Sequence, residues 1–198
     1  MQNIEENKDL SPEEDIRRAA DVMRRGGVIL YPTDTVWGIG CDARNSEAVK
    51  HIYEIKKRVD NKALITLVGD LGMLERTVCG IPDVAYDLIE FSERPLTIVY
   101  DEGTGVAPEL KGIDGTIGVR MTKEDFSQRL CRRVGAPIVS TSANISGEPT
   151  PRTFAEISPE ILNAVDYVCA TRRNDRTPGQ PSSVMRLSED GTFKVLRP

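Results

Sequence analysis

The stretch 28-VILYPTDTVWGIG-40 joins a short apolar run to a turn that is rich in hydroxyl groups and glycines. Residues 28–31 predict a buried strand that runs into Pro32. The turn that follows holds two threonines and two glycines, so hydroxyls and close backbone approach are available to a ligand. A plain turn, in which the glycines only permit a positive φ, explains the same residues. Trp37 fits the role of a core anchor.

Helices are expected on both sides of this strand. Before it, Ser11 is the expected N-cap, with Pro12 at the first helical position and a glutamate three residues after the cap. Apolar residues then recur at helical spacing until Gly26, where the helix should end. After the strand, Ser46 is the expected cap of a second helix, which ends in the basic cluster 56–58.

The rest of the chain alternates apolar runs with helical patterns. Strands are predicted at 63–68, 96–100, 116–121, 137–141, 166–169, 183–187 and 193–196. Helices are predicted near 70–78, 82–91, 123–134 and 153–165, with loops at 101–115, 142–152 and 171–180. Because no strict βαβ rhythm appears, the pattern favours an α/β protein with a mixed sheet covered by helices. We expect a flexible N-terminus at 1–10 and a single domain over 11–198.

Composition narrows the class of protein. The 198 residues carry 26 basic and 31 acidic side chains, a formal net charge of −5, which argues against sequence-independent binding along a nucleic-acid backbone. A local basic cavity remains compatible with that balance. Four cysteines stand without a C-x-x-C pair, so reduced thiols are expected rather than zinc or disulfides, and no metal site is predicted. With a polar start and no long apolar run, the protein is expected to be cytoplasmic, without membrane contact.

Two further polar segments could contribute to a site. Residues 56–62, KKRVDNK, hold four cations that could converge on a polyphosphate. Taken alone, the cluster is better explained by the favourable interaction of cations with the helix C-terminus and by ordinary solvation. Residues 140–150, STSANISGEPT, could hold a nucleotide phosphate or ribose, or could serve only as a cap and turn. His51 and the pair 132–133 are expected on the surface, and the arginines of the loop 171–180 fit either solvation or a phosphate clamp.

Six segments, taken together and in this order, resemble the YrdC-like family of threonylcarbamoyl-AMP synthases. They are YPTDTVWGIG at 31–40, KKRVDNKAL at 56–64, GTIGVRM at 115–121, PIVSTSANISGEPTP at 137–151, PSSV at 181–184 and VLRP at 195–198. Each segment alone is a weak signal, whereas the combination is specific. The resemblance spans about residues 15–198 and is to the single-domain bacterial type. It implies a twisted mixed sheet flanked by helices around a basic cavity.

The resemblance also implies an activity. Such an enzyme is a nucleotidyltransferase that joins L-threonine, bicarbonate and ATP into threonylcarbamoyl-AMP and pyrophosphate, with Mg²⁺ expected on the ATP. A separate transferase complex then modifies tRNA with the threonylcarbamoyl group, and direct contact with tRNA stays open. The alternative is a paralogue that binds nucleotide or RNA without synthase activity. Ser142 and Asn144, which form the Ser-x-Asn element, favour the synthase.

Residue roles carry over from the matching positions. The threonine-binding residues implied are Thr35, Arg120, Ser140 and Ser183. The ATP-binding residues implied are Arg58, Lys62, Thr116, Ser142, Asn144, Thr150 and Arg197, and the catalytic charges are Lys56 and Arg58. The chain departs from the family pattern at Glu93–Thr97, at Leu67 and in the loop 170–180. A basic cavity suits the reaction because it offsets the repulsion between carboxylated threonine and the α-phosphate, without a covalent nucleophile.

Overall fold

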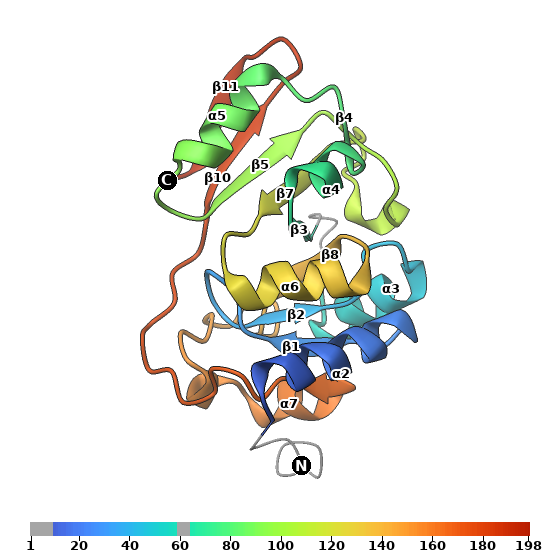
Figure 1. Cartoon of the computed structure of the whole chain (residues 1–198), viewed down its shortest axis with the longest axis vertical. Coiled ribbons are helices and arrows are strands. Elements are labelled where there is room, and N and C mark those ends of the chain that lie inside the picture. Colours follow the sequence, from blue (N-terminus) through green and yellow to red (C-terminus); the bar gives the residue numbers. More distant parts are fainter. Residues whose placement is uncertain (1–9, 59–63) are drawn as a thin grey trace.

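The computed structural model describes residues 10–58 and 64–198 (Figure 1). Its helices are α2 (Pro12–Arg24), α3 (Ser46–Ile55), α4 (Leu71–Glu75), α5 (Asp83–Phe91), α6 (Asp125–Val134) and α7 (Pro159–Ala164), with 3-10 turns at Pro108–Leu110 and Phe154–Glu156. Its strands are β1 (Ile29–Tyr31), β2 (Gly38–Gly40), β3 (Ile65–Val68), β4 (Val78–Cys79), β5 (Leu96–Tyr100), β6 (Glu102–Gly103), β7 (Ile117–Met121), β8 (Ile138–Ser142), β9 (Tyr167–Val168), β10 (Ser183–Leu187) and β11 (Phe193–Arg197).

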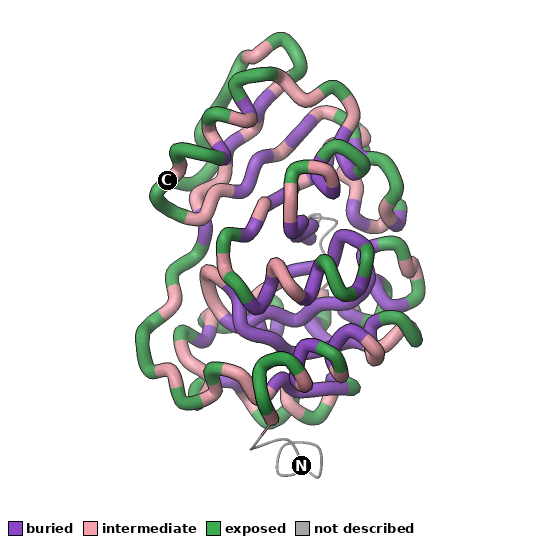
Figure 2. The backbone as a smooth tube through the Cα atoms, viewed as in Figure 1, coloured by how far each residue is buried: buried purple, intermediate pink, exposed green. Residues whose placement is uncertain are grey.

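The strands form a large mixed sheet, which confirms the predicted fold class. Nine of them follow the order β11-β10-β5-β7-β3-β8-β2-β1-β9, and β4 pairs with β6 in a separate ribbon. Neighbours β1 and β9, β3 and β7, and β5 and β10 run parallel, while the other neighbouring pairs of the large sheet run antiparallel. Burial is greatest along the inner strands such as β1, β2 and β3, whereas the edge strand β11 is exposed and the helices turn exposed faces outward (Figure 2).

Residues 38–40 form a strand, where the sequence pattern predicts part of a turn. Tyr31 pairs with Gly38, so β1 and β2 make a hairpin around the loop that carries Thr33 and Thr35. A Cβ at Gly40 would lie 2.3 Å from the carbonyl oxygen of Val139. Gly40 therefore allows this strand to lie close against β8, and it needs no positive φ to do so.

The first helices follow the predicted caps with one correction. Ser11 Oγ accepts a hydrogen bond from the Glu14 amide at 3.3 Å, so α2 begins as predicted. The second helix is capped by Asn45, whose Oδ1 accepts from the Ala48 amide at 3.1 Å, and Ser46 is its first helical residue. Either side chain is a good cap, and backbone geometry selects the earlier one.

Other differences lie in short elements. The helix predicted near 70–78 ends at Glu75, because the chain then enters β4. The helical region predicted at 153–165 is a 3-10 turn followed by α7. Two-residue strands and single turns have too little periodicity for a sequence pattern to resolve.

The chain crosses the whole sheet once late in its course. Strand β9 is one edge of the sheet, whereas β10 lies next to the opposite edge. Residues 169–182 make this crossing along the outside of the molecule (Figure 1). This crossing segment brings Pro181 and Ser182 to the central strands.

Among the described residues, none of the helices has the length and apolar character that a membrane span requires.

Candidate active site

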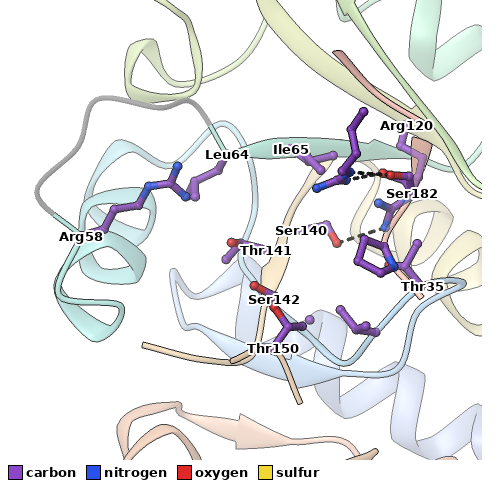
Figure 3. A pocket seen from close by; sticks show the side chains of 14 residues that line it. Thr35, Arg58, Leu64, Ile65, Arg120, Ser140, Thr141, Ser142, Thr150 and Ser182 are labelled. Atoms are coloured by element: carbon purple, nitrogen blue, oxygen red, sulfur yellow. Dashed lines mark hydrogen bonds between the residues drawn. The ribbon is translucent and has the colours of Figure 1, made fainter. Parts of the chain in front are cut away.

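A cavity of about 270 Å³ opens over the central strands, and we call it the central cavity (Figure 3). It is lined by Thr35, Val36, Gly38, Arg58, Leu64, Ile65, Arg120, Ser140, Thr141, Ser142, Thr150, Pro181, Ser182 and Arg197. These residues come from segments that are widely separated in the sequence, and they include residues from all the segments that carry the family resemblance.

Strand pairing explains how these segments meet. β3 lies between β7 and β8, with Leu67 opposite Arg120 and Ile65 opposite Ser140. β2 pairs with the end of β8, where Gly38 faces Ser142. Strands β7 and β8, on either side of β3, therefore deliver a guanidinium and three hydroxyl groups to one space.

The cavity is strongly cationic. Its described lining contains Arg58, Arg120 and Arg197 and no acidic side chain. In Figure 3, Arg58 lies across the cavity from Thr35 and Arg120. Arg197 is held in place because its Nε donates to the Ser182 carbonyl at 2.9 Å and its Nη2 to Ser182 Oγ at 3.2 Å. Three guanidiniums around one space suit a polyanionic ligand.

Lys56 lies behind the cavity wall and is 2% exposed. Its ammonium donates to the carbonyl oxygens of Ser142 and Asn144, at 2.6 and 2.7 Å, and its own carbonyl accepts from the Ser146 amide at 2.9 Å. Burial, followed by the neighbouring Arg58, lowers the pKa of Lys56 to about 8. Lys56 therefore ties the end of α3 to the loop that follows β8, and it is absent from the cavity lining.

Arg120 faces an acidic partner on its other side. Its Nη2 lies 3.1 Å from Asp34 Oδ1, and the two side chains are 3% and 12% exposed. Nη2 also makes a long contact of 3.5 Å to Ser140 Oγ. The pKa of Asp34 is raised by burial, an effect that Arg120 opposes. Arg120 thus has both a structural partner and a face on the cavity, a pairing that the sequence pattern did not predict.

The hairpin loop orders its own hydroxyls. Thr33 Oγ1 accepts from the Thr35 amide at 3.0 Å and donates to the Val36 carbonyl at 2.7 Å. The two threonine hydroxyls lie 3.0 Å apart. Trp37 is buried and packs on Phe154 with ring centroids 4.8 Å apart, which confirms its role as a core anchor. The loop is therefore preorganised, with the Thr35 side chain at the cavity.

Asn144 holds the loop after β8 in shape. Its Nδ2 donates to the carbonyls of Ile145 and Glu148, each at 2.9 Å. Its Oδ1 is buried and has no hydrogen-bond partner within the described part of the chain. A buried acceptor without a donor is costly in a folded protein and is often met at a ligand site.

The structure brings together most of the site residues that the resemblance implies. Those in the lining are Thr35, Arg58, Arg120, Ser140, Ser142, Thr150 and Arg197. Thr116, Asn144 and Ser183 lie outside it, and Lys62 falls among the residues that the structure does not describe. Ser182 takes the place at the cavity that was expected for Ser183. Ser182 is 2% exposed, and its Oγ lies 2.8 Å from Thr97 Oγ1. Because Ser182 and Ser183 are adjacent, the sequence does not show which of the two faces the cavity. The direction in which the chain enters β10 decides it.

Comparison with known proteins agrees with this geometry. The family model named for Sua5, YciO and YrdC, described as telomere recombination, matches residues 21–198. A curated Idiomarina loihiensis protein named threonylcarbamoyl-AMP synthase is 34% identical over 186 residues, which are 92% of this chain and 97% of the relative.

Solved structures share the fold. A structure of P. abyssi Sua5 carrying H234A/Y235A superposes with a TM-score of 0.84 at 30% identity, covering 97% of this chain and 58% of that one. P. abyssi Sua5 complexed with L-threonine superposes with a TM-score of 0.78 at 29% identity, covering 90% and 52%. This chain thus spans just over half of the Sua5 protein. The family model covers most of the chain and the curated relative almost all of it, so the chain belongs to the Sua5, YciO and YrdC family.

Proposed function

We infer that this chain is a threonylcarbamoyl-AMP synthase, an enzyme that joins L-threonine, bicarbonate and ATP and releases pyrophosphate. The observation that carries this inference is the central cavity, which lines one space with three arginines and a series of hydroxyls in a chain of this family. A curated relative of nearly the same length bears that name, and a Sua5 structure was solved with L-threonine. Both findings favour the synthase over a paralogue that only binds nucleotide or RNA.

We propose that the cavity has an ATP side and a threonine side. Arg58, Ser142, Thr150 and Arg197 would bind ATP, with Asn144 acting through the shape of its loop. Thr35, Arg120 and Ser140 would bind threonine, with Ser182 at the cavity in place of Ser183. For Lys62 and Thr116, the proposed role in ATP binding rests on the family resemblance alone. Lys56 is better described as a positioning residue, because its ammonium is engaged by two carbonyls.

The geometry suits a transfer between two anions. The carboxylated threonine is an anion that must approach the anionic α-phosphate, and negative charge moves onto the phosphoryl oxygens and the pyrophosphate leaving group in the transition state. Arginines on opposite sides of the cavity can offset that charge and hold the reactants together. The guanidiniums of Arg120 and Arg197 are already held by Asp34 and Ser182, so these two need little reorganisation during the reaction.

Mg²⁺ fits this site as a companion of the nucleotide. It prefers oxygen ligands and keeps several waters, often using substrate phosphates. The described lining offers hydroxyls but no carboxylate, so the triphosphate would hold the ion and it would supply further charge neutralisation there. Transfer of the product's threonylcarbamoyl group to tRNA by a separate complex is the proposed next step.

The test is direct product analysis. Purified protein incubated with L-threonine, bicarbonate, ATP and Mg²⁺ should yield threonylcarbamoyl-AMP and pyrophosphate, detected by mass spectrometry. Reactions lacking threonine or bicarbonate are the controls. Arg120→Ala, with folding checked by circular dichroism, should abolish product. ATP binding without product in the complete mixture would instead support the paralogue that binds nucleotide alone.

A further inference from the structure

Asp34 and Arg120 form a buried pair of opposite charges beside the proposed threonine position. The Oδ1–Nη2 distance is 3.1 Å, and both side chains are largely buried. Yet Asp34 Oδ1 and Arg120 Nε each lack a hydrogen-bond partner among the described residues. Arg120 Nη2 lies within ion-pair distance of Asp34 Oδ1, and its charge opposes the effect of burial on the carboxylate. Removing both charges from water is costly, so a further partner of opposite charge would stabilise either member of the pair.

The pair stands at the junction of two cavities. Arg120 lines the central cavity, and Asp34 lines a second cavity of about 350 Å³ under the crossing segment. Thr35 and Pro181 line both, so the two cavities meet beside the pair. A small ligand held at Thr35 can therefore present one group to Arg120 and another to Asp34.

An amino acid is complementary to this arrangement. Its carboxylate matches a guanidinium, and its ammonium matches a carboxylate, with both groups on one carbon. We propose that Asp34 binds the α-ammonium of the substrate while Arg120 binds its carboxylate, so that the buried pair selects a zwitterionic amino acid. The proposal depends on the proposed function, because it assumes that threonine binds at Thr35 and Arg120.

Glu124, the carboxylate whose charge acts on Asp34, is engaged elsewhere. Glu124 uses its carboxylate oxygens to cap α6, accepting from the amides of Phe126 and Ser127 at 3.2 and 2.7 Å. Burial raises the pKa of Asp34, as expected for a carboxylate with too little compensation. An ammonium beside the 12% exposed Asp34 carboxylate would offset the cost of burying its charge.

Ligand analogues test this role separately from folding. L-Threonine and (3R)-3-hydroxybutanoate share a carboxylate and hydroxyl, and only threonine has the ammonium. Calorimetry should show that the wild-type chain binds threonine about tenfold or more tightly than the hydroxy acid. In Asp34→Asn this preference should fall close to one, because the variant loses the charge that distinguishes the two ligands.

Arg120→Lys is the matched control. Both ligands carry the carboxylate, so this variant should weaken both by similar factors and keep the preference for threonine. A structural role of Asp34 alone would weaken both ligands equally in Asp34→Asn. An unchanged preference in that variant overturns the proposal, and so does a wild-type chain that binds the hydroxy acid as tightly as threonine.

Two further arms keep the test decisive. If Asp34→Asn does not fold, Asp34→Glu replaces it. The longer side chain displaces the carboxylate, so the preference should again fall, and a wild-type preference counts against the proposal. Synthesis of threonylcarbamoyl-AMP by the wild-type chain, combined with an unchanged preference in the variant, refutes the role of Asp34 alone. Absence of both product and threonine binding refutes the proposed function itself.

Discussion

At the scale of single residues, the charge of Lys56 is linked to the position of the loop after β8. Its buried ammonium holds the carbonyls of Ser142 and Asn144, and its pKa is lowered to about 8 by burial and by Arg58. Protonation of this one side chain therefore affects both the position of the loop after β8 and the charge near Arg58.

Raising the pH through about 8 should weaken ATP binding, because the ammonium loses its charge. Lys56→Arg should flatten this profile, since a guanidinium stays protonated throughout. Calorimetric titration with ATP between pH 7 and about 9.5 measures the affinity of the wild-type chain and of Lys56→Arg. Parallel profiles in the two proteins would show that Lys56 has no part in the pH dependence.

The lowered pKa of Lys56 has the opposite effect on stability: ATP affinity should fall as the pH rises, whereas the stability of the folded chain should increase. The pKa of Lys56 is lower in the folded chain than its ordinary value of 10.5, so between about 8 and 10.5 the unfolded chain binds more protons. The contribution of Lys56 to the stability of the folded state therefore grows as the pH rises through that window. Loss of ATP affinity at high pH, if it comes from Lys56, is then separable from unfolding.

Arg58 is the second residue whose role can be isolated. It lies just past the end of α3, with its guanidinium 6.0 Å from the ring centroid of Tyr53, and it lines the cavity. Arg58→Ala should lower ATP affinity about tenfold or more, since a charge-assisted hydrogen bond contributes roughly 1.5–3 kcal/mol. Arg132→Ala, on the exposed face of α6, is the control. Equal ATP affinities in the two variants by calorimetry would remove Arg58 from the site.

At the scale of elements, the loop after β8 combines ligand binding with structure. Ser142 lines the cavity, whereas Asn144 makes two hydrogen bonds that close the turn toward Glu148. The two polar residues of the Ser-x-Asn element therefore have different tasks in this chain.

Single variants should separate these tasks. Ser142→Ala should reduce product formation with little change in melting temperature. Asn144→Ala should reduce it too and also lower the melting temperature by about 2–4 °C, the effect of roughly 1 kcal/mol in a protein of this size. Differential scanning calorimetry gives the melting temperature of each variant, and product assays give its activity. Equal melting losses in both variants would mean that Ser142 is also structural.

At the scale of the whole molecule, Asp15 ties the first helix to the crossing segment. This carboxylate is fully buried and accepts from the Tyr167 hydroxyl at 2.7 Å, from the Thr171 amide at 2.7 Å and from the Thr171 hydroxyl at 2.6 Å. It thereby anchors the start of the segment that carries Pro181 and Ser182 to the cavity.

Asp15→Ala should destabilise the protein by at least about 2 kcal/mol, because it leaves buried donors without an acceptor. Asp21→Ala on the exposed side of the same helix removes only surface ion pairs and should cost under about 1 kcal/mol. Urea denaturation gives both free energies of unfolding. A loss at Asp15 no larger than that at Asp21 would argue against the anchor.

The local pattern of the sequence was enough for much of the fold. Period and caps predicted α2, β1, β5 and α6 within a few residues, because these elements are set by side chains close in sequence. The pattern did not reveal β2. Its two glycines look like turn residues, and only pairing with β1 and with the distant strand β8 makes them residues of a strand.

The site divides in the same way. The ordered motifs of this sequence by themselves determined the family and the residue types that a threonine and ATP site requires, because those motifs lie in contiguous segments. Only the tertiary structure decided that Ser182 lies at the cavity, that Lys56 faces two carbonyls and that Arg120 meets Asp34. Each of these depends on contacts between strands and loops far apart in the chain. Burial and charge pairing at such contacts arise from packing, which no local sequence pattern encodes.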